Sequence, residues 1–158
     1  MAGTQALRVL QSAGVAHTVH EIPSEPGDLG YARAAALALG VEEARVFKTL
    51  VALVDDEAVV AVVPSSGQLS LKAIAEAAGG KRAEMAPPAL AERLTGYVVG
   101  GISPLGQKKP LRTFVDESAI LFETVFVSAG RRGLDVSLAP DDLVAITGCE
   151  YADLAVER

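Results

Sequence analysis

A single lysine interrupts an otherwise apolar run in the first third of the chain. Lys48 lies within Val46-Phe-Lys-Thr-Leu-Val-Ala-Leu-Val54, and strand alternation would place it on one face with four apolar residues of this run. A buried ammonium is costly unless it is paired. The lysine therefore either reaches solvent from a strand end, or it lies in a pocket as a cation for a carbonyl, phosphate or carboxylate ligand. The sequence leaves both interpretations open.

A glycine-rich loop, Gly100-Gly-Ile-Ser-Pro-Leu-Gly106, lies in the second half of the chain. The spacing from Gly101 through Gly106 to Lys108 resembles a phosphate-binding P-loop, but the lysine comes one position late and no Ser or Thr follows it to hold Mg²⁺. This disfavours a nucleotide-hydrolysing loop. Two interpretations remain: a tight turn that needs positive φ, or paired glycines whose N–H groups converge on an oxyanion or a phosphate oxygen.

A short turn, Ala129-Gly-Arg-Arg-Gly133, lies between Ser128 and Asp135. If it joins two antiparallel strands, both side chains come to the same rim. Each also has a simpler explanation, since Ser128 could be a turn hydroxyl and Asp135 a strand-end charge. The basic pairs Arg131-Arg132 and Lys108-Lys109 are either solvated surface or local phosphate contacts.

The chain holds few residues for metal or nucleophilic chemistry. Its two histidines, His17 and His20, would point to opposite faces of a strand, so they make poor joint metal ligands. Its one cysteine, Cys149, excludes a disulfide framework and has no basic neighbour to lower its pKa. No histidine lies near a serine in the sequence, which disfavours a Ser-His-Asp triad. We expect neither a metal nor a cofactor.

The elements that position these residues follow from apolar periodicity, caps and turn signals. The polar link Asp55-Asp-Glu57 predicts a hairpin between its flanking strands. Expected helices cover residues 4–13, 30–39, 70–78, 87–94 and 140–146, and expected strands cover residues 16–22, 45–54, 58–63, 97–99, 111–115, 124–128, 134–138 and 151–155, with a loop at 23–28. We therefore predict an α+β fold. It would be one domain over residues 1–158, with a mixed, mostly antiparallel sheet that is curled, barrel-like and surrounded by helices.

The composition restricts the class of protein. The 158 residues are 50% hydrophobic and 22% charged, with a formal net charge of −6, which fits one folded domain and argues against disorder. The first residues lack the pattern of a secretory signal, and no stretch reaches the about 18 apolar residues of a membrane span. We therefore expect a cytoplasmic protein without a membrane partner. The acidic balance disfavours a general nucleic-acid binder.

Four segments resemble one known family. They are Val46-Phe-Lys-Thr-Leu50, Ser66-Gly-Gln-Leu69, the fifteen residues from Thr95 to Lys109, and Ser128-Ala-Gly-Arg-Arg-Gly-Leu-Asp135. In this order they are similar to the YbaK/EbsC-type Cys-tRNA(Pro) deacylases, of the superfamily of the editing domain inserted in bacterial prolyl-tRNA synthetase. The resemblance implies a trans-editing hydrolase that clears mischarged Cys-tRNA(Pro) or Cys-tRNA(Cys). Such editing is needed because a hydrophobic pocket discriminates poorly between cysteine and proline, which are close in size.

The resemblance also implies the residues of the site. The implied catalytic residues are Lys48, Gly100, Gly101, Ser128 and Asp135, and the implied substrate-binding residues are Thr49, Ile102, Ser103, Ile22, Lys108 and Arg131. The family mechanism is substrate-assisted: the cysteine thiol of the substrate attacks its own carbonyl and releases a thiolactone. The enzyme then has to orient the ester and stabilise the oxyanion. Two positions depart from the family pattern, Ile22 where relatives carry tyrosine and Ala129 where they carry glycine, and Ala129 disfavours positive φ.

Two other functions remain open on the sequence. A sister deacylase would remove alanine or another small amino acid from tRNA(Pro), and a non-catalytic module would hold tRNA ends without cleaving them. The expected partners are the aminoacyl end of mischarged tRNA and prolyl-tRNA synthetase, with no DNA. The net charge of −6 argues against wide contact with the tRNA body, so the basic pairs would contact only the phosphates of an acceptor end and selectivity would come from the synthetase.

Overall fold

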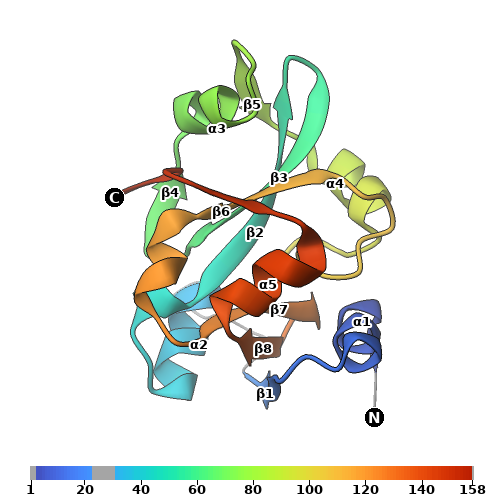
Figure 1. Ribbon diagram of the computed structural model, residues 1–158, viewed down its shortest axis with the longest axis vertical. Coiled ribbons are helices and arrows are strands. Elements are labelled where there is room, and N and C mark those ends of the chain that lie inside the picture. The colour runs from blue at the N-terminus through green and yellow to red at the C-terminus, as the bar shows by residue number, and fades with distance from the viewer. Residues whose placement is uncertain (1–2, 23–30, 158) are drawn as a thin grey trace.

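The fold is that of a computed structural model, and its description covers residues 3–22 and 31–157. Within these ranges the helices are α1 (Gln5–Ala13), α2 (Tyr31–Leu39), α3 (Leu71–Ala77), α4 (Pro88–Thr95) and α5 (Pro140–Thr147), with 3-10 turns η1 (Glu43–Arg45) and η2 (Glu117–Leu121). The strands are β1 (Thr18–Glu21), β2 (Phe47–Val54), β3 (Glu57–Pro64), β4 (Gly67–Leu69), β5 (Ala83–Met85), β6 (Arg112–Asp116), β7 (Val125–Arg131), β8 (Leu134–Leu138), β9 (Glu150–Ala152) and β10 (Ala155–Glu157). Helices lie around the strands, which confirms the α+β class (Figure 1).

The strands form three sheets. The largest has the order β5-β2-β3-β6-β9, in which β5, β2 and β3 are antiparallel and β3, β6 and β9 are parallel. β1, β8 and β7 make an antiparallel sheet, and β10 pairs with β4 in a third. The predicted mixed, mostly antiparallel character is confirmed, but the barrel-like shape is not supported, because no sheet of the described strands closes. Closure needs a continuous ladder, but Val46, directly before β2, and Phe126 of β7 form only an isolated bridge.

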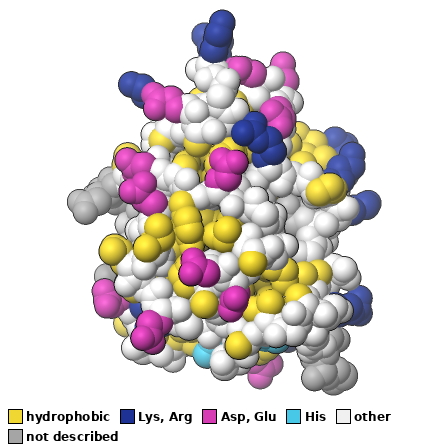
Figure 2. Space-filling model, viewed as in Figure 1, with side chains coloured by type: hydrophobic (Ala, Val, Ile, Leu, Met, Phe, Trp, Pro, Cys, Tyr) yellow, Lys and Arg dark blue, Asp and Glu magenta, His cyan; other side chains and the backbone are white. Residues whose placement is uncertain are grey.

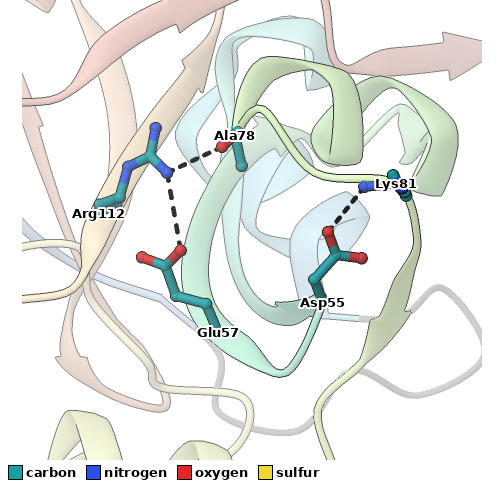
Figure 3. A network of polar contacts seen from close by, with 5 residues as sticks. All are labelled: Asp55, Glu57, Ala78, Lys81 and Arg112. Carbon is teal, nitrogen blue, oxygen red and sulfur yellow. Dashed lines mark hydrogen bonds and ion pairs between the residues drawn. The ribbon is translucent and has the colours of Figure 1, made fainter.

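The β2–β3 hairpin is confirmed and is the framework of the largest sheet. Its turn residues Asp55 and Asp56 both have positive φ, 47° and 71°, as a two-residue type I′ turn requires. The Asp55 carboxylate accepts hydrogen bonds from the N–H groups of Lys81 at 2.9 Å and Arg82 at 3.0 Å (Figure 3 draws the first). The tip of the hairpin is thereby tied to the segment that follows α3.

A second group of polar contacts lies beside this turn (Figure 3). The Arg112 guanidinium of β6 donates a hydrogen bond to the Ala78 carbonyl at 2.9 Å, and it lies 3.8 Å from the Glu57 carboxylate. These groups are exposed, so the ion pair itself adds little to stability. Arg112 thus links β6 to the start of β3 and to the residue that follows α3.

The hydrophobic core lies on both faces of the β2–β3 pair. In β3 every residue of the run Val59–Val63 is 0% exposed. Alternate residues point to opposite faces, so Val60 and Val62 pack with α1, β7 and β8, whereas Val59 and Val63 pack with α3. A continuous apolar run is typical of a strand buried on both sides. This packing gives β2, which carries Lys48, a rigid support.

Several predicted helices are confirmed together with their caps. The Thr4 hydroxyl accepts a hydrogen bond from the Leu7 N–H at 3.2 Å at the start of α1. The Ser70 hydroxyl accepts one from the Ala73 N–H at 3.1 Å at the start of α3. Both are the bonds that a helix N-cap makes. α5 ends at Gly148, whose φ is 69°.

Other strand predictions differ from the structure. Residues 97–99 form no strand, because the Tyr97 hydroxyl donates to the Leu105 carbonyl at 2.6 Å and holds a loop instead. The predicted strand 151–155 is two strands, β9 and β10, which belong to different sheets. The strands β4 and β5 are not predicted, since three residues are too few to show alternation. The loop expected at 23–28 and the helix start at Gly30 lie outside the described residues.

One face of the molecule carries acidic side chains spread over much of its area. Figure 2 shows them there, with Lys and Arg side chains toward the upper part and the right margin of the view. This distribution accords with the net charge of −6 and gives this face no broad basic surface for a phosphate backbone. In the described part of the chain, no helix combines the length and the apolar character needed to cross a membrane.

Candidate functional site

A cavity of about 420 Å³ lies between β2 and β7. Val46, directly before β2, forms an isolated parallel bridge with Phe126 of β7, while β7 pairs along its length with β8 and β2 pairs with β3. Such a volume is within the usual range of small-molecule sites, about 300–1,000 Å³. The predicted residues that line the cavity are Ile22, Lys48, Thr49, Gly100, Ile102, Ser128, Arg131 and Asp135.

Ser128 and Asp135 are brought together by the register of β7 and β8. They lie directly opposite each other in the antiparallel ladder, so their side chains share one face. A bulge follows between Ser128 and Arg131. Within this bulge Gly130 has a positive φ of 106°. The Ser128 hydroxyl accepts a hydrogen bond from the Gly130 N–H at 3.1 Å. Ala129 does not have positive φ, so its departure from the family pattern leaves the turn unstrained.

Lys48 is half-buried on β2 at the wall of the cavity. Its Nζ donates a hydrogen bond to the Gly67 carbonyl of β4 at 3.0 Å. β4 is in turn paired with β10, and a Cβ on Gly67 would lie 2.8 Å from the Val156 carbonyl oxygen. Lys48 is thus a lining residue whose ammonium is held by Gly67, which does not itself line the cavity, so the pocket interpretation of Lys48 stays a prediction.

Asp135, on β8, also lines the cavity. Its carboxyl is buried, and the residue is only 9% exposed. Loss of hydration raises the pKa of its carboxyl to about 7. Across the β1–β8 ladder it faces His20, whose Nε2 lies 2.9 Å from the Ser137 hydroxyl and whose own pKa is lowered by burial. A cationic ligand beside Asp135 would favour the charged form of its carboxyl. This residue is therefore suited to receive an ammonium group.

The variant Asp135→Asn is expected to lack one pH dependence of the free energy of unfolding that the wild type has. The folded-state pKa of about 7 exceeds the unfolded value of about 4, so this carboxyl stabilises the fold fully below about pH 4 and the contribution disappears as the pH rises through 7. The free energy of unfolding of the wild type should therefore fall, relative to that of the variant, between pH 5 and pH 8. Urea unfolding at both pH values measures this, and parallel pH profiles for the two proteins would contradict it.

The two adjacent glycines of the loop have different environments. Gly100 borders the cavity with a φ of 92°, and its N–H has no hydrogen-bond partner among the described residues. The N–H of Gly101 donates to the Val98 carbonyl at 2.9 Å, and Gly101 does not line the cavity. The expectation that both N–H groups converge on an oxyanion is therefore not met, because the Gly101 N–H is already engaged. Of the two, Gly100 is the donor at the cavity.

The variant Gly101→Ala is expected to displace this loop and to lower both stability and activity. A Cβ there would lie 2.7 Å from the Cα and C atoms of Arg131 and 2.8 Å from the N atom of Arg132. These are backbone atoms, which cannot rotate away, so we expect a destabilisation of about 1–3 kcal/mol. Urea unfolding measures it. The control is Gly3→Ala, where nothing lies within 4 Å of the new Cβ, and equal stability of the two variants would contradict the close approach.

Besides Gly101, two predicted residues are not brought to the cavity, Ser103 and Lys108. Ser103 is 0% exposed, and its hydroxyl accepts a hydrogen bond from the Leu105 N–H at 3.2 Å, so it shapes the loop from inside. Lys108 is exposed and is not a lining residue. Arg131 does line the cavity, and its guanidinium lies 3.9 Å from the Glu21 carboxylate.

One wall of the cavity is apolar, and the sequence pattern does not predict it. Its residues include Met85, Ala86, Pro88, Ala91 and Val99. These residues come from short segments that are distant in sequence from both β2 and β7. No local spacing in the sequence therefore predicts that they lie beside these strands. Thr49 also lines the cavity, and its hydroxyl is buried without a hydrogen-bond partner in the described structure. The site thus combines an apolar surface with a few polar groups, as small-ligand sites do.

The chemistry available in this cavity is positioning and charge stabilisation. Its lining residues, all from the described part of the chain, include no histidine and no cysteine. They therefore contain no pair of protein nucleophile and histidine base. The ammonium of Lys48, the N–H of Gly100 and the carboxyl of Asp135 can orient a substrate and stabilise charge that develops on it. This arrangement suits a reaction whose nucleophile is supplied by the substrate.

Comparison with known proteins gives relatives that agree with this arrangement. The sequence model of the aminoacyl-tRNA editing domain family matches residues 29–146. The chain is 36% identical over 156 residues to a protein of Enterococcus faecalis whose assigned name is Cys-tRNA(Pro)/Cys-tRNA(Cys) deacylase EbsC, a match over 98% of this chain and 94% of that protein. It is also 35% identical over 95 residues to a proline–tRNA ligase of Maridesulfovibrio salexigens, which is 60% of this chain and 16% of that protein.

The same relationship holds for the three-dimensional fold. A crystal structure described as that of a trans-editing enzyme for prolyl tRNA synthetase superimposes with a TM-score of 0.86 and 28% identity, over 96% of this chain and 95% of that chain. The resemblance found in the four sequence segments is therefore confirmed over nearly the whole length. This chain belongs to the aminoacyl-tRNA editing domain family.

Proposed function

We propose that this protein is a trans-editing aminoacyl-tRNA deacylase that clears Cys-tRNA(Pro), with Cys-tRNA(Cys) as a further substrate. The observation that carries the proposal is the grouping of Lys48, Gly100, Ser128 and Asp135 around one cavity whose lining, in the described residues, has no histidine and no cysteine. The name of the Enterococcus faecalis relative supports the substrate class.

The nucleophile in this proposal is the thiol of the cysteinyl group. Its sulfur attacks the ester carbonyl, the C–S bond forms as the C–O bond to the terminal ribose breaks, and the thiol proton ends on the departing ribose oxygen. The products are a cysteine thiolactone and free tRNA, and water then opens the thiolactone to cysteine. Holding the thiol and the carbonyl in one orientation supplies much of the acceleration.

Five polar groups of the cavity have a task in this reaction. The Asp135 carboxylate holds the α-ammonium, and the Gly100 N–H donates to the carbonyl oxygen as negative charge develops on it. The Lys48 ammonium, anchored by the Gly67 carbonyl at 3.0 Å, stabilises the charge on the ester oxygens. The Ser128 hydroxyl contacts the terminal ribose. The buried hydroxyl of Thr49 takes a hydrogen bond from the bound aminoacyl group, which removes the cost of leaving it unpaired.

Three mischarged substrates test the proposal: Cys-tRNA(Pro), Ser-tRNA(Pro) and Ala-tRNA(Pro). The cysteinyl and seryl esters differ only in sulfur for oxygen, so they form a matched pair for the thiol mechanism. We expect rapid release of cysteine, trapping of the thiolactone, and slow loss of serine and alanine. Equal cleavage of the alanyl ester would replace the proposal with the sister deacylase. Binding of Cys-tRNA(Pro) without acceleration of ester loss would replace it with the non-catalytic module.

We further propose that the protein works in the cytoplasm and draws its tRNA selectivity from prolyl-tRNA synthetase. The net charge of −6 disfavours tight binding of the tRNA body. The match to 16% of the length of a proline–tRNA ligase supports a link to that enzyme class, because a similar domain is there part of the synthetase chain. Adding purified synthetase should lower the KM for Cys-tRNA(Pro). An unchanged KM would contradict the partnership.

A further inference from the structure

Arg132 lies outside the cavity, yet it contacts the loop that carries Gly100. Its side chain is exposed at the β7–β8 turn, and its Nε donates a hydrogen bond to the Val99 carbonyl at 3.0 Å. The sequence leaves the Arg131-Arg132 pair as surface charge or as phosphate contacts. The structure separates the two residues, because Arg131 lines the cavity and Arg132 does not.

The bond from Arg132 acts on the same peptide unit that contains the Gly100 N–H. A peptide unit is planar, and in the trans form its C=O and N–H groups point in opposite directions; the described chain has no cis peptide. Fixing the Val99 carbonyl toward Arg132 therefore directs the Gly100 N–H away from Arg132. A cationic donor on the carbonyl also polarises the peptide, which strengthens its N–H as a donor.

The neighbouring peptide is held as well. The Glu92 carboxylate of α4 accepts a hydrogen bond from the Val99 N–H at 2.8 Å. The two peptides on either side of the Val99 Cα are thus fixed by side chains of opposite charge from separate elements. A loop held at both peptides keeps its next N–H in one orientation, as preorganised oxyanion donors require.

The backbone conformation explains why residue 100 is glycine. With a φ of 92°, Gly100 has a backbone conformation that L side chains rarely adopt. A Cβ there would lie 2.6 Å from the Arg132 Nε and 3.3 Å from its Cγ. These short distances show how closely the Arg132 side chain packs against Gly100.

We propose that Arg132 is a positioning residue for catalysis, which orients and polarises the Val99–Gly100 peptide so that the Gly100 N–H donates to the developing oxyanion. This inference rests on the proposed deacylase function. It differs from a phosphate contact in a measurable way. A positioning role affects the transition state and therefore kcat, whereas a phosphate contact affects tRNA binding, KM and the dependence on salt.

The test compares Arg132→Ala, Arg132→Lys and the control Arg93→Ala in cleavage of Cys-tRNA(Pro). Arg93 is an exposed arginine on α4, beside Glu92, so its removal changes the net charge equally. We expect Arg132→Ala to lower kcat about tenfold, a fraction of the loss of a whole oxyanion donor, with KM within twofold of the wild type. Arg132→Lys should recover most of this loss, and Arg93→Ala should match the wild type.

Two further measurements separate positioning from unfolding and from tRNA binding. Thermal unfolding should give similar midpoints for all variants, and the ¹H–¹⁵N signal of Gly100 should shift in Arg132→Ala but not in Arg93→Ala. Equal kcat for Arg132→Ala and Arg93→Ala would overturn the inference while the deacylase stands. A change confined to KM, with a smaller salt dependence, would overturn it in favour of a phosphate contact. A wild type without cleavage would instead remove the proposed function and this role with it.

Discussion

The variant Lys48→Ala is expected to lower kcat for Cys-tRNA(Pro) by about 100-fold, the scale of losing one preorganised group that stabilises transition-state charge. Lys48 is a half-buried lining residue of the cavity, and its Nζ donates a hydrogen bond to the Gly67 carbonyl at 3.0 Å. At such a site its charge is less screened than on the surface. Single-turnover deacylation under saturating enzyme measures the effect on the chemical step directly.

The control for this prediction is Lys72→Ala, which removes an exposed lysine of α3. We expect it to leave kcat unchanged. Lys48→Arg keeps the charge but has a larger, planar head group, so we expect it to recover activity only in part. A Lys48→Ala variant that is folded by circular dichroism and retains wild-type turnover would exclude Lys48 from the site.

The variant Asp116→Ala is expected to destabilise the fold by about 3 kcal/mol, because several N–H groups would lose a charged acceptor at once. Asp116 is 4% exposed. Its Oδ1 accepts hydrogen bonds from the N–H groups of Leu154 and Ala155, both at 2.9 Å, and its Oδ2 accepts one from Ser118 at 3.2 Å. One carboxylate therefore joins the end of β6 to η2 and to the start of β10.

Urea unfolding of Asp116→Ala and Asp116→Asn measures this effect. The asparagine keeps one acceptor oxygen for the Leu154 and Ala155 N–H groups, so we expect it to lose clearly less stability. Because β10 pairs with β4, which carries the anchor of Lys48, the alanine variant should also lose deacylase activity before it unfolds globally. Equal stability of the wild type and Asp116→Ala would contradict the structural role.

Much of the candidate site is predictable from short stretches of sequence. Ser128 and Asp135 flank a turn between two apolar strands, so their pairing follows from hairpin geometry. Lys48 is recognisable because a cation inside an apolar strand needs a partner. Ser103 and Gly101 look equally suitable in the sequence, but their polar groups are already engaged, with Leu105 and Val98.

The sequence also predicted many of the helices and strands of the fold. Caps, glycine stops and the Asp55-Asp56 turn place most helices and the β2–β3 hairpin, because each depends on neighbouring residues only. The barrel-like sheet was wrongly expected, since the pairing of distant strands has no local signal. β4 and β5 could not be predicted for the same reason, because their partners β10 and β2 are distant in the sequence.

The sequence by itself determined the residue types of this site, its local hairpin and its lack of metal-binding and disulfide patterns. It also determined the family, through four segments in a defined order. The tertiary structure alone decided that the segment of β2 and the strand β7 come together near the Val46–Phe126 bridge and line one cavity. It also decided that Gly100, and not Gly101, lines that cavity, and that Arg132 donates a hydrogen bond to the neighbouring Val99 carbonyl. The physical reason is that local patterns specify hydrogen bonds between neighbours, whereas a cavity depends on packing among segments far apart in the chain.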